Sequence, residues 1–189
     1  MTDIYLKAID LYGFKTFANL THIEFSKNLN VITGPSASGK SNLLTAITWV
    51  LSDSLDNNQT ENKSLFCGTE NYPASNFAEV TIYYGKEKDT CSDFKIKRRL
   101  DRNGKNLWFI NNNTYINFEE FSVRRKNLPI TDICILDDYD KIIESERNSK
   151  QYIVVLNDKI VVTKIKPNRL IGLTQEKKGV SESYILQFE

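Results

Sequence analysis

The chain has 189 residues, a formal net charge of +1 and three cysteines without C-x-x-C spacing. This length can bury one core, or one core and a smaller lobe. The near-neutral charge excludes a protein that coats nucleic acid over its whole surface. The scattered cysteines disfavour a disulfide framework or a zinc site and favour a reducing compartment. No apolar run approaches membrane-spanning length, so we expect a cytoplasmic protein without membrane contact.

Alternating apolar and polar residues dominate the first part of the chain. They predict strands within residues 3–14 and 21–32, with turns near Gly13 and Asn28. His22, the one histidine, lies in this alternating stretch. We interpret it as a surface or packing residue rather than a catalytic base.

The most informative motif is a phosphate-binding pattern, G-x-x-x-x-G-K-S, that begins at Gly34. A short apolar run precedes it, and apolar residues at helical spacing follow it as far as Leu51, which is the strand-loop-helix context that such a loop needs. Backbone N–H groups and the helix N-terminus would face the phosphates. Lys40 would reach the β- and γ-phosphate oxygens, and the Ser41 hydroxyl would ligate magnesium. The candidate binding residues of the loop are Gly34, Pro35, Ser36, Ala37, Ser38, Gly39, Lys40, Ser41 and Asn42.

A polar stretch over residues 52–64 predicts a loop, and alternation resumes at 77–84. Residues 94–118 give the clearest hairpin signal, with Asn103 and Gly104 suited to a type I′ turn. Three basic residues share one face of its first arm: Lys95, Lys97 and Arg99. We favour a solvated sheet face here, and DNA contact is the alternative.

The second half of the chain predicts buried strands. Four apolar residues, Ile133 to Leu136, end in acidic residues, as expected of a buried parallel strand that carries carboxylates to the edge of a sheet. A short helix is predicted within 139–150, and further strands at 151–156 and 182–188. Strands alternating with helices beside a phosphate loop indicate an α/β nucleotide-binding sheet.

These segments together resemble a known family. Residues 5–53, 66–84, 94–113 and 118–121 resemble, in order, the N-terminal head lobe of structural-maintenance-of-chromosomes (SMC) ATPases, the DNA-organising branch of the ABC ATPases. Residues 132–140, 151–159 and 168–189 resemble the end of the C-terminal head lobe. The resemblance implies a P-loop ABC-type ATPase head of the α/β class, with an antiparallel β subdomain and a central, mostly parallel sheet. Its lobes, 1–128 and 129–189, would be fused directly.

The resemblance also assigns roles to individual residues. Lys15 and Thr16 match the segment that lies near the adenine, and Asp137 matches the carboxylate that supports magnesium. Asp138 stands where the family has a glutamate that activates the attacking water, and its side chain is one methylene shorter. Asn157 replaces the switch histidine and cannot exchange a proton near neutral pH. Ala37 stands where glycine is usual, which is tolerable only at a negative φ.

Several parts of the family pattern are missing. No coiled coil or hinge separates the lobes, no two of the eight glycines are adjacent as a signature loop requires, and no glutamine lies between Gln59 and Gln151. Phosphoryl transfer depends on positioned charges around the γ-phosphate. We therefore expect a head that binds ATP and Mg²⁺ but hydrolyses ATP poorly or not at all.

The resemblance implies several partners. Such a head would act as a regulatory module that docks on a complete SMC head or a kleisin-like subunit, in association with the nucleoid or chromosome, and self-dimerisation stays open. Two alternatives remain. One is an active ATPase completed in trans by a partner head, and the other is a nucleotide-independent structural remnant.

Overall fold

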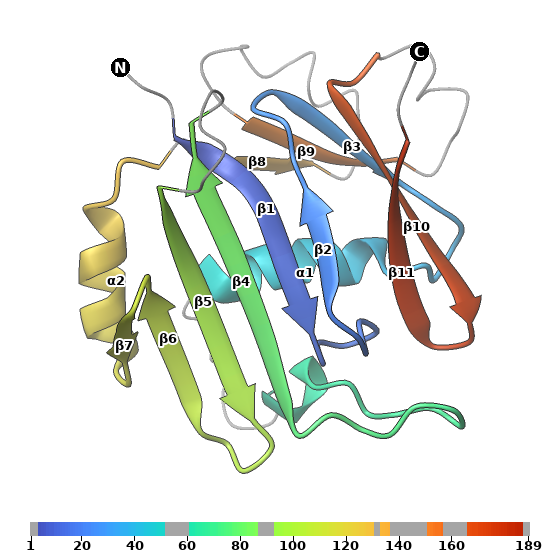
Figure 1. Cartoon of the computed structure of the whole chain (residues 1–189), viewed down its shortest axis with the longest axis horizontal. Helices are drawn as coiled ribbons and strands as arrows, with labels where there is room; N and C mark the ends of the chain where they lie inside the picture. The colour runs from blue at the N-terminus through green and yellow to red at the C-terminus, as the bar shows by residue number, and fades with distance from the viewer. Residues whose placement is uncertain are drawn as a thin grey trace.

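The computed structural model describes residues 4–51, 61–86, 93–130, 133–136, 151–156 and 166–186 (Figure 1). Two β-sheets and a helix between them form the molecule. The first sheet has six strands in the order β2-β1-β4-β5-β6-β7, and all its pairs are antiparallel. Its strands are β1 (Tyr5–Tyr12), β2 (Thr21–Glu24), β4 (Phe77–Gly85), β5 (Phe94–Asp101), β6 (Asn106–Ile110) and β7 (Asn113–Tyr115).

The second sheet has five strands in the order β11-β10-β3-β9-β8. Its members are β3 (Leu29–Thr33), β8 (Ile133–Leu136), β9 (Gln151–Leu156), β10 (Arg169–Lys177) and β11 (Val180–Leu186). All neighbours are parallel except β10 and β11, which form an antiparallel hairpin. The antiparallel subdomain and the mostly parallel sheet confirm the predicted fold class.

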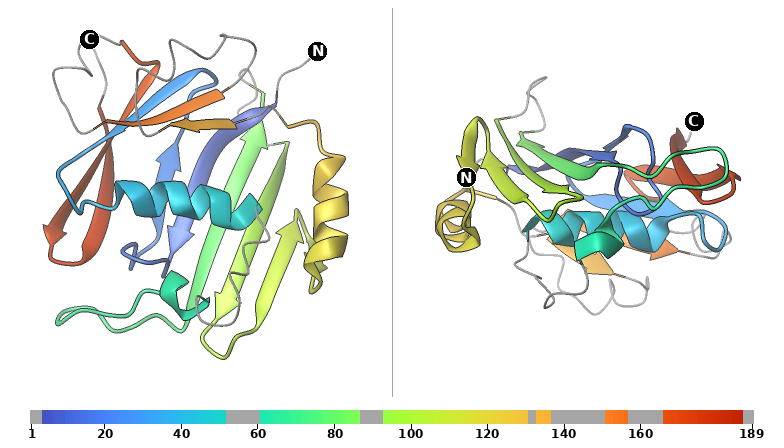
Figure 2. Two further views of the ribbon diagram at one scale, coloured as in Figure 1. Left: turned by 180° about the vertical axis from the view of Figure 1, so that it is seen from behind. Right: turned by 90° about the horizontal axis from the view of Figure 1, so that it is seen from below.

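Helix α1 (Lys40–Leu51) runs across the antiparallel sheet, and its N-terminal end lies beside the β10–β11 hairpin (Figure 2). Its buried apolar residues recur three and four positions apart, as an amphipathic helix requires: Leu43, Ala46, Ile47 and Val50. They belong to one core that also contains Ile153 of β9 and Ile171 of β10. The boundary between lobes at residue 128 stays a prediction.

Two buried amide side chains tie this core together. Gln151, at the start of β9, accepts a bond from the Leu6 N–H and donates to the carbonyls of Leu6 and Ser26. Asn30 of β3 donates to the carbonyls of Ser26 and Tyr152. Both side chains are fully buried, and a buried amide is stable only when such partners are present. Gln151 therefore links β9 of the parallel sheet to β1 of the antiparallel sheet.

The remaining short elements connect the sheets. A 3₁₀ turn, η1 (Glu61–Ser64), lies in the second part of the predicted loop, and helix α2 (Phe118–Lys126) packs against β6 and β7. Only residues 127–132 separate α2 from β8 along the chain, and the direct fusion of two lobes stays a prediction. None of the described helices is long and apolar enough to cross a bilayer.

Two expectations need correction, and two elements were not predicted. The hairpin turn at 101–104 is not type I′, because Gly104 has a φ of 87° while Asn103 is not among the residues with positive φ, and that turn needs both. The Gly104 N–H instead bonds the Asp101 carbonyl at 2.9 Å, which closes a turn of another type. Strand β8 is half-buried rather than buried, because it lies at the end of its sheet. Strand β10 and helix α2 were not predicted.

Candidate nucleotide-binding site

The phosphate loop joins β3 to α1 and rests on the β10–β11 hairpin. A side chain at Gly34 would place its Cβ 2.2 Å from the Leu173 carbonyl oxygen, and one at Gly39 would lie 2.2 Å from Ser181 Oγ. No other residue type fits at such approaches. Between the glycines, Pro35, Ser36 and Ala37 are exposed. The two glycines of the motif are thus required by packing against the hairpin.

Ala37 has a φ of +64°. The expectation that an alanine at this position needs a negative φ is therefore not met. An alanine in the left-handed region brings its Cβ close to the following carbonyl oxygen, which costs about 1–2 kcal/mol. The alanine therefore strains the loop that the glycine of the family pattern would relax.

We expect Ala37→Gly to stabilise the protein. Relief of the strain outweighs the extra chain entropy of glycine in the unfolded state, which leaves a gain of about 0.5–1 kcal/mol in the free energy of unfolding. Urea titration measures this gain. Ala74→Gly is the matched control, because Ala74 is exposed and is not among the residues with positive φ, so it should lose stability. Equal losses in the two variants would contradict the strain at Ala37.

Lys40 is the first residue of α1, directly after the glycine that ends the loop. Its Nζ donates to the carbonyls of Gly34 and Pro35, each at 2.7 Å, and the residue is only 8% exposed. Burial lowers the pKa of this ammonium from its ordinary value. The side chain is thus folded back over the loop, where phosphate oxygens can replace the two carbonyls as acceptors.

Ser38 gives an independent indication that the loop fits phosphate. Its residue is 1% exposed, and its hydroxyl has no hydrogen-bond partner. Leaving a buried hydroxyl unpaired costs about 1–3 kcal/mol, a cost that a phosphate oxygen within reach would remove. Ser41 and Asn42 lie in the first turn of helix α1, and the Ser41 side chain is exposed.

The two residues expected near the adenine lie beside this loop. Lys15 and Thr16 form a tight turn closed by backbone bonds between Phe14 and Phe17, at 2.8 and 3.1 Å. Thr16 Oγ1 accepts a bond of 2.8 Å from Asn42 Nδ2 of α1, so the turn is fastened to the helix that follows the phosphate loop. Burial lowers the pKa of Lys15.

The parallel strands direct their C-terminal ends toward one edge of the sheet. Thr33 of β3 pairs with Leu156 of β9, and Leu136 of β8 pairs with Val154. Asp137 and Asp138 follow β8, and Asn157 follows β9, but all three lie outside the described residues. Their roles stay predictions, as does the magnesium ligation that pairs Ser41 with Asp137. The described residues contain no cluster of three metal-ligating side chains.

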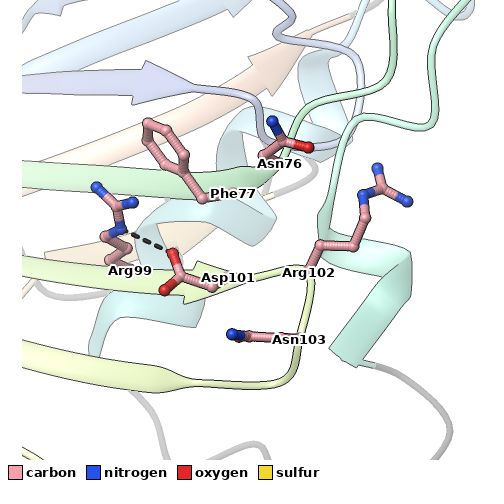
Figure 3. A pocket seen from close by; sticks show the side chains of 6 residues that line it. All are labelled: Asn76, Phe77, Arg99, Asp101, Arg102 and Asn103. Atoms are coloured by element: carbon pink, nitrogen blue, oxygen red, sulfur yellow. Dashed lines mark hydrogen bonds and ion pairs between the residues drawn. The ribbon is translucent and has the colours of Figure 1, made fainter.

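The three basic residues of β5, Lys95, Lys97 and Arg99, lie on the outer face of the antiparallel sheet, away from α1. Lys97 Nζ pairs with Glu79 at 3.2 Å. Arg99 Nε donates to Asp101 at 2.9 Å, a bond that Figure 3 shows. The Arg99 guanidinium also lies 3.8 Å from the centre of the Phe77 ring, at a hollow of about 320 Å³. Two of the three charges are therefore paired within the protein, which agrees with a solvated face. DNA contact stays a prediction.

His22 is exposed, and its Nδ1 lies 2.5 Å from Asp10 Oδ1. This position confirms that it is a surface residue.

Comparison with known proteins identifies the family. Residues 5–130 match the model of the RecF/RecN/SMC N terminal domain. The chain belongs to this family. The chromosome partition protein Smc of Halothermothrix orenii is 28% identical over 188 residues, which cover 95% of this chain and 14% of that relative. The chain thus spans a small part of that relative's length.

Solved structures agree with this assignment. One described as the structural biochemistry of ATP-driven dimerization and DNA stimulated activation of SMC ATPases is 30% identical. The match covers 63% of this chain and 76% of that one, with a TM-score of 0.55. An SmcHead bound to the C-winged helix domain of ScpA has a TM-score of 0.73 and 16% identity, and the match covers 98% of both chains. The latter likeness shows the SMC head fold alone.

The sequence did not reveal every residue that shapes the site of this SMC head. Leu173 and Ser181 of the β10–β11 hairpin contact the loop glycines, although more than 130 residues separate them from it. Neither belongs to a recognisable motif, and only the parallel pairing of β10 with β3 brings the hairpin to the loop. The strand pairing, which the sequence does not specify, was the missing information.

Proposed function

We propose that this SMC head binds ATP with Mg²⁺ and hydrolyses it very slowly or not at all on its own. The observation that carries the proposal is the Lys40 ammonium, which is held over the loop by two carbonyls that phosphate oxygens can replace. The unpaired Ser38 hydroxyl supports it. The loop from Gly34 to Asn42 would hold the phosphates, and Lys15 and Thr16 would lie near the base.

Slow hydrolysis follows from the residues that would act on water. At position 138 an aspartate is one methylene too short to take a proton from water placed for a glutamate. Asn157 can hydrogen-bond but cannot exchange a proton near pH 7. Magnesium, held by Ser41 and Asp137, would neutralise phosphate charge when bound. The chain also has no adjacent glycines with which to complete the site of a second head.

We propose that the bound nucleotide gates docking onto a complete SMC head, with a kleisin as the second candidate partner. The solved structure concerned with ATP-driven dimerization of SMC ATPases supports docking onto a complete SMC head. The solved Smc head bound to ScpA supports a kleisin partner. This chain would place its phosphate loop against the signature loop of the partner head, but it has no signature loop of its own. Of the two nucleotide sites shared between the heads, only one would therefore close. Such a module would regulate chromosome organisation and lie at the chromosome, in the cytoplasm.

Steady-state ATP hydrolysis tests this function. We expect the purified chain to show turnover no greater than the Lys40→Ala variant. Turnover that appears only after a complete SMC head is added, and is lost in Lys40→Ala, would favour the alternative of an ATPase completed in trans. Rapid turnover by the chain alone would contradict the proposal. A pull-down that enriches neither an SMC head nor a kleisin would contradict the docking.

A further inference from the structure

Ser181, on the last described strand, contacts the nucleotide site directly. It lies in β11 and is 2% exposed. Its N–H donates to the Thr16 carbonyl at 2.8 Å, and its hydroxyl donates to Thr16 Oγ1 at 2.7 Å. Two bonds therefore join one residue of the hairpin to the turn expected near the adenine.

Thr16 passes this contact on to the helix that follows the phosphate loop. Its Oγ1 accepts bonds from both Ser181 Oγ and Asn42 Nδ2, at 2.7 and 2.8 Å. One oxygen thus joins β11, the turn at residues 15–16 and the first turn of α1. A hydroxyl oxygen can accept two bonds while its own proton remains free to donate.

Ser181 also limits the position of the loop itself. A Cβ at Gly39 would meet Ser181 Oγ at 2.2 Å, Ser181 Cβ at 2.9 Å and Thr16 Oγ1 at 3.3 Å. Gly39 directly precedes Lys40, so the backbone that presents Lys40 packs against the serine. The hairpin is held firmly on the other side, because Gly172 of β10 pairs with Thr33 at the end of β3 and Val180 packs with Phe66.

We propose that Ser181 is a positioning residue, through which the C-terminal hairpin sets the shape of the phosphate loop and thereby the affinity for nucleotide. This inference rests on the proposed nucleotide binding for its effect on affinity. Its effect on loop geometry does not depend on that function. Ser181 acts through Thr16, and the two hydroxyls form one unit.

A double-mutant cycle in ATP affinity tests this coupling, measured by calorimetry with Mg²⁺. Ser181→Ala is expected to weaken ATP binding about tenfold, because Thr16 loses one of the two donors that fix it. Thr16→Val removes the shared oxygen at constant shape and should weaken binding at least as much. In the Thr16→Val background, Ser181→Ala should then have little further effect, since residues of one network are not additive.

Two controls separate positioning from general stability. Ser183→Ala alters a serine two residues along the same strand and should bind ATP like the wild type. Thr16→Ser keeps the shared oxygen and should retain most of the affinity. Equal affinity of Ser181→Ala and wild type, or effects that add fully in the double variant, would overturn the inference.

Hydrogen exchange of the nucleotide-free protein separates this inference from the proposed function. Amides of residues 16–18 and 39–43 should exchange faster in Ser181→Ala than in Ser183→Ala. If the wild type bound no ATP, the proposed function would fail, and faster exchange would still support the positioning by Ser181. Unchanged exchange in both regions would overturn it.

Discussion

Replacing Lys40 with alanine is expected to weaken ATP binding by about 100-fold. The ammonium makes two charge-assisted hydrogen bonds with loop carbonyls, and the same donors would serve the β- and γ-phosphates. Each bond to a charged group contributes about 1.5 kcal/mol or more, and about 3 kcal/mol corresponds to a factor of about 100 in affinity. Competition with a fluorescent ATP analogue measures this loss.

Matched variants make the Lys40 experiment specific. Lys105→Ala removes the same charge from an exposed lysine in the β5–β6 turn, and it should bind ATP like the wild type. Lys40→Met keeps the apolar stem of the side chain, so it tests whether loss of the stem disturbs the loop. We expect both Lys40 variants to lose ATP to a similar extent while thermal unfolding stays cooperative. Unchanged affinity in Lys40→Met would show that the ammonium does not contact nucleotide.

Replacing Arg98 with alanine is expected to lower the free energy of unfolding by about 4 kcal/mol. Arg98 is 1% exposed, and its guanidinium lies between two indole rings, 4.3 Å from the centre of Trp49 and 4.8 Å from that of Trp108. Its Nη1 donates to the Trp49 carbonyl at 2.8 Å, and its Nε donates to Asn106 at 3.1 Å. Buried cation–π contacts are worth about 2 kcal/mol, and leaving a buried acceptor unpaired costs about 1–3 kcal/mol.

The position of Arg98 explains why the fold depends on it. The Trp49 carbonyl belongs to the last turn of α1, whose carbonyl groups lack partners within the helix and carry partial negative charge. Arg98 therefore fixes the C-terminal end of α1 to β5. The N-terminal end of the same helix carries Lys40 and Ser41, so the contact also supports the site.

Arg99→Ala is the control for Arg98, since the two residues are adjacent and have the same charge. Arg99 is half-exposed on the opposite face, and its ion pair with Asp101 should contribute less than about 1 kcal/mol. Urea titration compares the two variants. Arg98→Lys keeps the charge but loses the planar guanidinium, so it should lower the free energy of unfolding by an intermediate amount. It replaces Arg98→Ala in the comparison with Arg99→Ala if Arg98→Ala does not fold. Similar losses for Arg98 and Arg99 would contradict the account.

The sequence predicted features that depend on local patterns. The spacing from Gly34 to Ser41 located the phosphate loop, and alternation located β1, β4 and β5. On β5 the same alternation separates Lys97, on the outer face, from Ile96, in the core. The alternation places Arg98 on the core face with Ile96, but the sequence did not show which groups stabilise a buried charge there, because Trp49 and Trp108 reach it only in the folded chain.

Features that depend on long-range pairing could not be predicted. Ser181 and Leu173 reach the phosphate loop only because β10 pairs with β3, and sequence spacing says nothing about that pairing. The φ of Ala37 is set by the closure of the loop between β3 and α1. The sequence therefore indicated that alanine needs a negative φ here, but it could not show that φ is positive. The predicted type I′ turn at Gly104 was wrong for a related reason, because the turn type follows from the register of β5 and β6.

We propose that the phosphate loop of this SMC head still binds nucleotide. Titration of ATP into the wild-type protein by calorimetry, with and without Mg²⁺, tests it most directly. We predict one site per chain, with a dissociation constant of about 1–10 μM, corresponding to about 7–8 kcal/mol, and weaker binding without Mg²⁺. No binding at about 100 μM protein, with the protein folded, would contradict the claim and show that the loop only supports the fold.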